Sequence, residues 1–148
     1  SYPDRRRQRA LHHAAAAEIG VFLAPHSGAI GSGMTRTITV AGLQLAFSGH
    51  RDADIAMTAA AARAAAAAGA QLVLPPELFE GHYFCRHEDE GLFANALPLD
   101  RHPAVAAMRE VALETRTYIP CSFFEKDGHH HYNSLAMIDD GGNVMGVY

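Results

Sequence analysis

Hydrophobic and polar positions follow two different periods along this chain, and each period predicts one kind of element. Apolar and smaller residues alternate from Thr37 to Phe47, which is typical of a half-buried strand. The short run Leu72–Leu74 is apolar and bounded by breakers, which predicts an interior strand. Three further segments predict strands near the C-terminal end, namely residues 118–124, 132–138 and 144–148.

Apolar positions three and four residues apart predict two helices. The first passes through an alanine-rich segment from Ile55 to Ala68 and ends at Gly69, and Ser48, Asp52 or Asp54 can cap it. The second begins at Pro103, and one face of it carries Val105, Met108, Ala112 and Thr115. Turn residues at 126–128 and 140–143 separate the last three strands.

Composition and charge narrow the class of protein. The chain has 148 residues, of which 49% are hydrophobic and 19% charged, as expected for one globular domain with a real core. No apolar span is long enough to cross a bilayer. The two cysteines make no disulfide framework, so we expect a cytoplasmic protein. The segment from 34 to 148 carries eight basic and fourteen acidic residues, and this net charge of −6 argues against nucleic acid as the main partner.

The first 33 residues differ from the remainder. Four arginines precede an alanine tract that is followed by several glycines, and Met34 is a natural start. An export signal is the alternative, but Glu18 interrupts the apolar run and no clear cleavage site follows. We therefore expect residues 1–33 to be a disordered upstream tail, with the domain spanning residues 34–148.

Glu77 is the first candidate for chemistry. Pro75 and Pro76 end the strand before it, because neither can donate to a sheet ladder, and chemistry in open sheets gathers at strand ends. The apolar residues that follow it, among them Leu78 and Phe79, are expected to exclude water and raise the pKa of the carboxyl toward that of a general base. The alternative is an ordinary solvated loop acid.

Several motifs in order carry a family resemblance. They are Ala41-Gly42-Leu43-Gln44-Leu45, the segment 69–74, the segment 76–85 with Pro-Glu-Leu-Phe-Glu-Gly-His-Tyr-Phe-Cys, Ser122-Phe123-Phe124-Glu125, and Tyr132-Asn133-Ser134-Leu135-Ala136 followed by Ile138-Asp139. From about residue 34 to residue 148 the chain resembles the N-terminal part of a carbon–nitrogen hydrolase of the nitrilase superfamily. Within the superfamily it is most similar to the branch that hydrolyses N-carbamoylputrescine to putrescine, carbon dioxide and ammonia.

The resemblance implies a fold and a mechanism. It implies an α+β fold, the N-terminal part of a nitrilase-like αββα sandwich with a mixed sheet flanked by helices, and a homo-oligomer. It also implies a Glu-Lys-Cys triad without a metal or organic cofactor, in which Glu77 is the general base. The family's lysine and cysteine would follow Tyr148, so this chain by itself should be catalytically incomplete. The alternative function is a binding or assembly module that keeps half of the sandwich.

Charge suggests the kind of substrate. Five acidic residues lie between Glu77 and Glu90 against Arg86 alone, which would favour a cationic amide substrate, although such a loop can also be a solvated face. We predict that Tyr83, Phe84 and Glu80 bind this substrate.

The other reactive side chains are expected to have structural or solvent-exposed roles rather than catalytic ones. Lys126, the single lysine, is expected in a solvated turn, and Cys121 is expected to pack in the core. We interpret Cys85 as a pocket-wall or structural thiol rather than the nucleophile. His129, His130 and His131, and the pair His82 and His87 around Cys85, lack the spacing of metal ligands, so no metal site is predicted.

Overall fold

A computed structural model describes residues 38–86 and 89–148 of the chain. The tail predicted for residues 1–33 therefore lies outside the described residues, as do His87 and Glu88.

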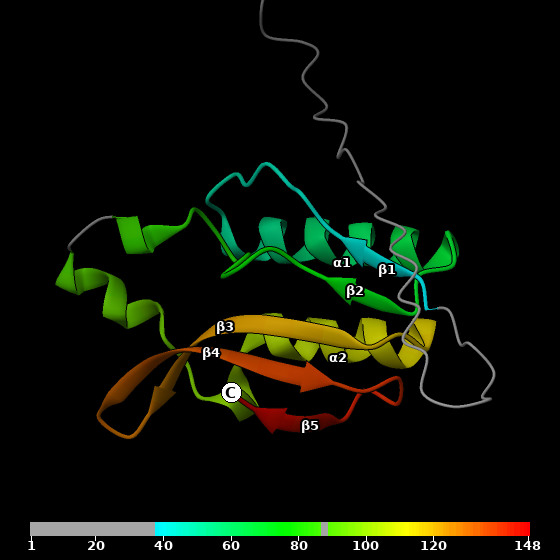
Figure 1. The fold of residues 1–148 in the computed structure, drawn as a ribbon. Helices are drawn as coiled ribbons and strands as arrows, with labels where there is room; N and C mark the ends of the chain where they lie inside the picture. The colour runs from blue at the N-terminus through cyan, green and yellow to red at the C-terminus, as the bar shows by residue number, and fades with distance from the viewer. Residues whose placement is uncertain (1–37, 87–88) are drawn as a thin grey trace, which may run out of the picture.

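The strands form a two-stranded and a three-stranded sheet, which a parallel β-bridge between Leu72 and Tyr118 links edge to edge (Figure 1). Strands β1 (Val40–Gly42) and β2 (Leu72–Leu74) pair in parallel, and β3 (Ile119–Asp127), β4 (His130–Ile138) and β5 (Val144–Val147) form an antiparallel meander. The backbone of Tyr118 joins the two parts, since it donates to the Gln71 carbonyl and accepts from the Val73 N–H, each at 2.9 Å.

Two helices cover one face of this sheet. Helices α1 (Arg51–Ala67) and α2 (Pro103–Thr115) lie side by side behind the strands in Figure 1. The alanines of α1 let it approach closely, because small side chains leave a smooth helix surface. Buried side chains of both helices meet those of the sheet in the main core, which includes Ala62, Met108, Val73, Ile119 and Phe123.

The opposite face of the sheet carries apolar side chains that remain exposed. Leu74 and Tyr118 are 46% and 38% exposed, and Met145 and Tyr148 at the C-terminal end are 64% and 99% exposed. In the described part of the chain, the helices therefore cover one face alone.

The loop between β2 and α2 is more ordered than the sequence predicts. It contains three short 3-10 helices, η1 (Phe84–Arg86), η2 (Glu90–Asn95) and η3 (Leu99–Arg101). A second, smaller core of Leu78, Ala96 and Phe124, with Phe84 against it, holds this loop to β3.

Two sequence-based boundaries need correction. Thr37 lies outside the described residues, and from residue 38 to Phe47 the predicted strand is limited to β1. The Leu43 N–H still donates to the Leu74 carbonyl at 2.9 Å, but beyond Leu43 no strand of the described residues pairs with this segment. Helix α1 begins four residues before Ile55, and His50, rather than Ser48 or an aspartate, is its N-cap. Asp54 instead lies inside the first turn, where its carboxylate accepts from the backbone of Ser48 and Gly49 at 2.8 and 2.9 Å.

No helix among the described residues has the length and apolar character needed to cross a membrane.

Candidate active site

Glu77 follows β2 directly after the two prolines, as predicted, and the chain reverses just beyond it. Leu78 has a φ of +48°, a left-handed conformation that is costly for a residue with a Cβ. Leu78 is buried in the smaller core and Phe79 in the main core. These two buried side chains fix the direction of the turn on which Glu77 lies.

A chain of hydrogen bonds ties Glu77 to the central hairpin. Asn133 on β4 donates through Nδ2 to Glu77 Oε1 at 2.5 Å, and its Oδ1 accepts from Ser122 Oγ on β3 at 3.4 Å. Ser122 Oγ in turn accepts from the Leu78 N–H at 3.3 Å. The contacts close a ring of four residues. They hold the carboxylate over the sheet face that the helices do not cover. Cys121 and Phe123, the strand neighbours of Ser122, are buried in the main core, so the Ser122 side chain lies on the opposite face.

Glu77 lines a surface cavity of about 360 Å³. The other lining residues are Leu74, Pro75, Pro120, Ser122, Asn133, Ser134, Leu135 and Tyr148. The last residue of the chain thus lies at the same cavity as the candidate base.

The predicted exclusion of water from Glu77 is wrong for the described chain. Its side chain is exposed, because Leu78 and Phe79 turn into the two cores and away from the carboxylate. Tyr83, six residues further along the loop, is itself 44% exposed. The pKa of the Tyr83 hydroxyl is nevertheless raised. The negative charge of Glu77 is the largest cause, and Cys85 is the second.

Glu80 lies in a buried ionic cluster. Its Oε2 is 2.8 Å from Arg51 Nε and its Oε1 is 3.3 Å from His102 Nε2. Burial alone would raise the pKa of Glu80, but the hydrogen bond and charge of His102 and the charge of Arg51 outweigh it and hold that pKa below its usual value. The contacts of Glu80 that the structure shows are thus made within the protein.

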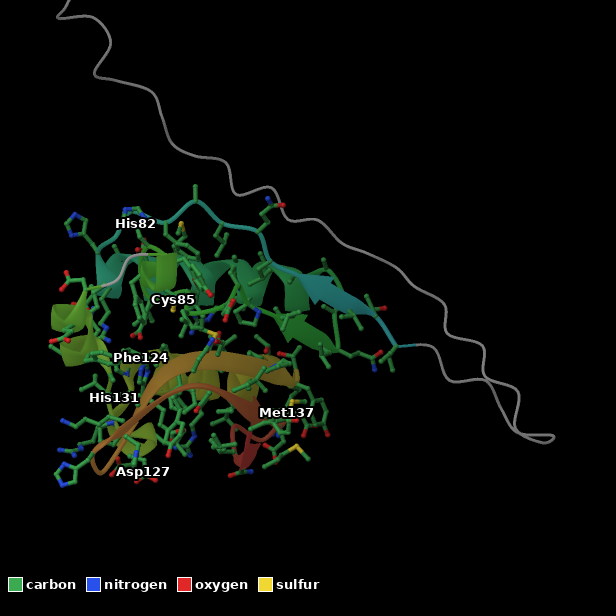
Figure 2. The ribbon with its side chains drawn as sticks, turned by 60° about the vertical axis from the view of Figure 1, so that its left-hand side comes forward. His82, Cys85, Phe124, Asp127, His131 and Met137 are labelled. Carbon is green, nitrogen blue, oxygen red and sulfur yellow. The ribbon has the colours of Figure 1, made fainter. Side chains whose placement is uncertain are left out.

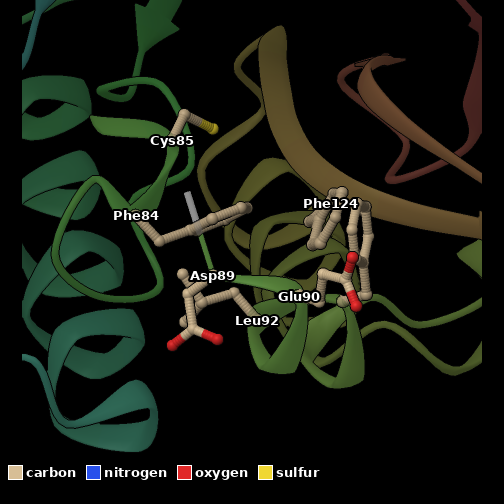
Figure 3. A pocket seen from close by; sticks show the side chains of 7 residues that line it. Phe84, Cys85, Asp89, Glu90, Leu92 and Phe124 are labelled. Atoms are coloured by element: carbon tan, nitrogen blue, oxygen red, sulfur yellow. The ribbon is translucent and has the colours of Figure 1, made fainter. Parts of the chain in front are cut away.

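Phe84 contributes to a larger aromatic cavity of about 580 Å³ (Figure 3). Its ring centroid is 4.8 Å from that of Phe124, and Cys85, Asp89, Glu90, Leu92 and Phe93 complete the lining. Figure 2 shows Cys85, Phe124 and His131 at one end of the molecule, far from Met137. The exposed thiol of Cys85 belongs to this wall, as the pocket-wall interpretation predicts.

Comparison with known proteins decides the family. A sequence profile of the carbon-nitrogen hydrolase family matches residues 37–148. The chain belongs to this family.

Curated relatives agree with this assignment. The chain is 41% identical over 116 residues to the N-carbamoylputrescine amidase of Arabidopsis thaliana and 39% identical over 111 residues to the citrullinase of Francisella tularensis. These matches cover 78% and 75% of the chain, but the chain spans 39% of the length of each relative.

Solved structures confirm the fold class. The carbon-nitrogen hydrolase of Helicobacter pylori G27 superposes with a TM-score of 0.68 at 27% identity, covering 75% of this chain and 38% of that one. An amidase from Nesterenkonia sp., at 22% identity, covers 75% of this chain and 41% of its own with a TM-score of 0.62. The α+β, nitrilase-like prediction is therefore confirmed.

The remaining reactive residues of this carbon–nitrogen hydrolase chain lie apart from Glu77. Lys126 is exposed near the tip of the β3–β4 hairpin, paired with His131 across the two strands, and is absent from the lining of the Glu77 cavity. Cys121 is fully buried, and burial, followed by the charge of Glu80, raises the pKa of its thiol. Within residues 38–86 and 89–148, no three histidine, cysteine or acidic side chains gather as a metal site would require.

Sequence reasoning missed four residues around the site: Ser122, Asn133, Arg51 and His102. Asn133 and Ser122 stood in the motifs that carried the family resemblance, and both are polar residues on the uncovered face of adjacent strands. This pattern could have identified both residues from the sequence. No sequence pattern identifies Arg51 and His102, because their contact with Glu80 depends on how the two helices start beside the loop.

Proposed function

We propose that the full-length protein to which this chain belongs hydrolyses the terminal ureido group of N-carbamoylputrescine, with Glu77 as general base. One observation carries the proposal. In a carbon–nitrogen hydrolase chain, a carboxylate lies at a strand end, fixed by Asn133 at 2.5 Å, on the rim of a cavity. The reaction would consume one water and release putrescine, carbon dioxide and ammonia, without a metal or cofactor.

The chemistry needs more than this chain contains. The carbon of a ureido group is a poor electrophile, so a thiol must be deprotonated before it attacks. Glu77 would accept that proton and later return it to the departing ammonia. A cation must then stabilise the oxygen that gains negative charge. We propose that a lysine and a cysteine outside residues 1–148 supply these two groups.

Charge favours an amine at the far end of the substrate. Asp89 and Glu90 line the aromatic cavity beside Cys85, and the rings of Phe84, Phe93 and Phe124 present faces on which a cation can rest. Tyr83 and Phe84 are the residues we propose to contact the alkyl chain.

Citrulline is a second candidate substrate. It carries the same terminal ureido group as N-carbamoylputrescine, and the Francisella relative is named a citrullinase. The two compounds differ at the opposite end, where citrulline bears a carboxylate beside its amine. An acidic, aromatic cavity should disfavour that carboxylate by electrostatic repulsion.

The test is a substrate comparison with protein expressed from the complete reading frame that contains this chain. We expect ammonia release from both compounds, with kcat/KM at least about 10-fold higher for N-carbamoylputrescine, the ratio that 1.4 kcal/mol of repulsion would give. A higher kcat/KM for citrulline would replace the proposed substrate. Absence of ammonia release from both would favour the alternative of a binding or assembly module.

A further inference from the structure

The ionic cluster of Glu80 joins segments that are distant in the sequence. Arg51 is the first residue of α1, and Glu80 lies in the loop after β2. His102 is the N-cap of α2. Arg51 also donates through Nη2 to the carbonyl of Asn95 at the end of η2, at 2.6 Å. The Glu80 carboxylate therefore brings the starts of both helices against the loop that carries Glu77, and Arg51 adds the end of η2 to the cluster.

A buried ionic cluster of this kind contributes little net stability by itself. His102 is fully buried and the Glu80 side chain is 9% exposed, and transferring ionised groups from water into protein costs several kcal/mol each. An apolar pair of similar volume would often stabilise a protein as well or better. Arg51 is also unfavourably placed for the dipole of α1, since cations are disfavoured at helix N-termini.

The geometry of the loop indicates that the cluster also restrains the turn at Leu78. Glu77 and Glu80 are three residues apart, with the left-handed Leu78 between them. A strained backbone persists only where the surroundings hold it from several sides. On one side of the turn, Ser122 and Asn133 hold Leu78 and Glu77, and on the other side Arg51 and His102 hold Glu80.

We propose that Glu80 is a positioning residue for the reaction: its ion pairs with Arg51 and His102 fix the turn at Leu78 and thereby the Glu77 carboxylate. This role rests on the proposed function of Glu77. The positioning role also differs from the role predicted from the sequence, in which Glu80 contacts the substrate. Glu80 lines a cavity of about 450 Å³ together with Tyr83 and Phe84, but both of its oxygens already lie beside protein nitrogens, Oε2 at 2.8 Å from Arg51 Nε and Oε1 at 3.3 Å from His102 Nε2.

The test compares Glu80→Gln with Glu114→Gln in the full-length protein. Glu114 makes an ion pair of the same length, 2.8 Å to Arg63 Nε, but its side chain is 57% exposed and it links the outer parts of α1 and α2. We expect Glu80→Gln to lower kcat per folded enzyme about 10- to 100-fold with KM changed less than about 3-fold, because a small displacement of a base costs rate rather than binding. Glu114→Gln should leave both constants within about 2-fold.

Hydrogen exchange of the peptide spanning residues 75–84 supplies a readout that does not depend on activity. Glu80→Gln should speed exchange in this peptide and leave β3 and β4 unchanged, because the loss is local. If wild-type protein has no ureido-hydrolase activity, the proposed function fails, while this measurement still decides whether Glu80 holds the turn.

Three results would overturn the proposal. A rise in KM with kcat unchanged would make Glu80 a substrate contact. Unchanged kcat and unchanged exchange would leave it without a positioning role. If Glu80→Gln fails to fold, Arg51→Lys and Arg51→Met decide: equal kcat in these two variants, where we expect Lys to restore at least about 5-fold over Met, would contradict a role for the ion pair.

Discussion

At the scale of single residues, the two cysteines have opposite surroundings. Cys85 is exposed at the aromatic cavity, while Cys121 is fully buried with the pKa of its thiol raised by burial and by the Glu80 charge. Only a thiolate attacks an alkylating or disulfide reagent. At pH 8 we therefore expect Cys85 to react and Cys121 to remain protected.

The measurement is mass spectrometry of iodoacetamide-treated protein after digestion, with and without denaturant. Label on Cys121 appearing under native conditions as fast as on Cys85 would contradict the burial of that strand. The Cys85→Ser variant is the control, and it should lack the rapid labelling seen in the wild-type protein.

Glu80 also gives a pH-dependent stability. Its pKa is lowered in the folded protein, so the ionised carboxylate contributes stability at pH values above its ordinary 4.5, and this contribution is lost as the pH falls below that value. At pH 7 we expect Glu80→Gln to reduce the free energy of unfolding by about 3 kcal/mol, since it leaves Arg51 and His102 without their shared anion.

Urea unfolding of wild type and Glu80→Gln at pH 7 and pH 3.5 checks this. The difference between the two proteins should shrink at the lower pH. An equal difference at both values would show that the carboxylate charge is not what stabilises the loop.

At the scale of elements, the turn between β4 and β5 contains a glycine that no other residue can replace without cost. Gly142 has a φ of +76°, and a Cβ there would lie 2.7 Å from the Arg109 carbonyl on α2. Gly128, in the β3–β4 turn, has a φ of +59° with open space around its Cβ position. An alanine at either position would have to adopt an unfavourable left-handed backbone conformation. At Gly142 its Cβ would also clash with the Arg109 carbonyl, whereas at Gly128 it would meet open space.

We therefore expect Gly142→Ala to destabilise by about 3 kcal/mol and Gly128→Ala by about 1 kcal/mol, the second value being the left-handed penalty alone. Thermal unfolding of the two variants measures this. Equal shifts in Tm would mean that the turn does not pack on α2 as described.

The sequence predicted elements best where local signals mark both ends. Leu72–Leu74 is bounded by Gly69 on one side and two prolines on the other, and α2 begins at its proline. Beyond β1, the alternating residues Leu43, Leu45 and Phe47 do pack against the main core. They form no strand, because periodicity reports burial and does not reveal whether a neighbouring strand exists.

At the scale of the whole molecule, the site depends on contacts that no local pattern contains. The Pro-Pro-Glu sequence was enough to select Glu77, but Asn133, its hydrogen-bond partner, is 56 positions away. Likewise, Arg51 and His102, the partners of Glu80, come from the starts of two helices. These contacts follow from the packing of α1 and α2 on one side of the sheet, which the sequence predicts only as a fold class.

The uncovered face of the sheet leads to a prediction about the chain by itself. Leu74 and Tyr148, which line the Glu77 cavity, and Met145 are exposed. In an αββα sandwich a second sheet packs on such a face. We expect the 148-residue chain to bind a hydrophobic dye strongly and the full-length protein to bind it weakly. Weak binding by both would favour the binding-module alternative.

The central claim is that Glu77 is the base of a ureido hydrolase. Glu77→Gln in the full-length protein tests it most directly, because the amide keeps the shape of the side chain and can still contact Asn133, but cannot accept a proton at neutral pH. With N-carbamoylputrescine we expect kcat to fall by about 10²- to 10⁴-fold and Tm to stay near that of wild type. A variant that retains wild-type kcat would contradict the account.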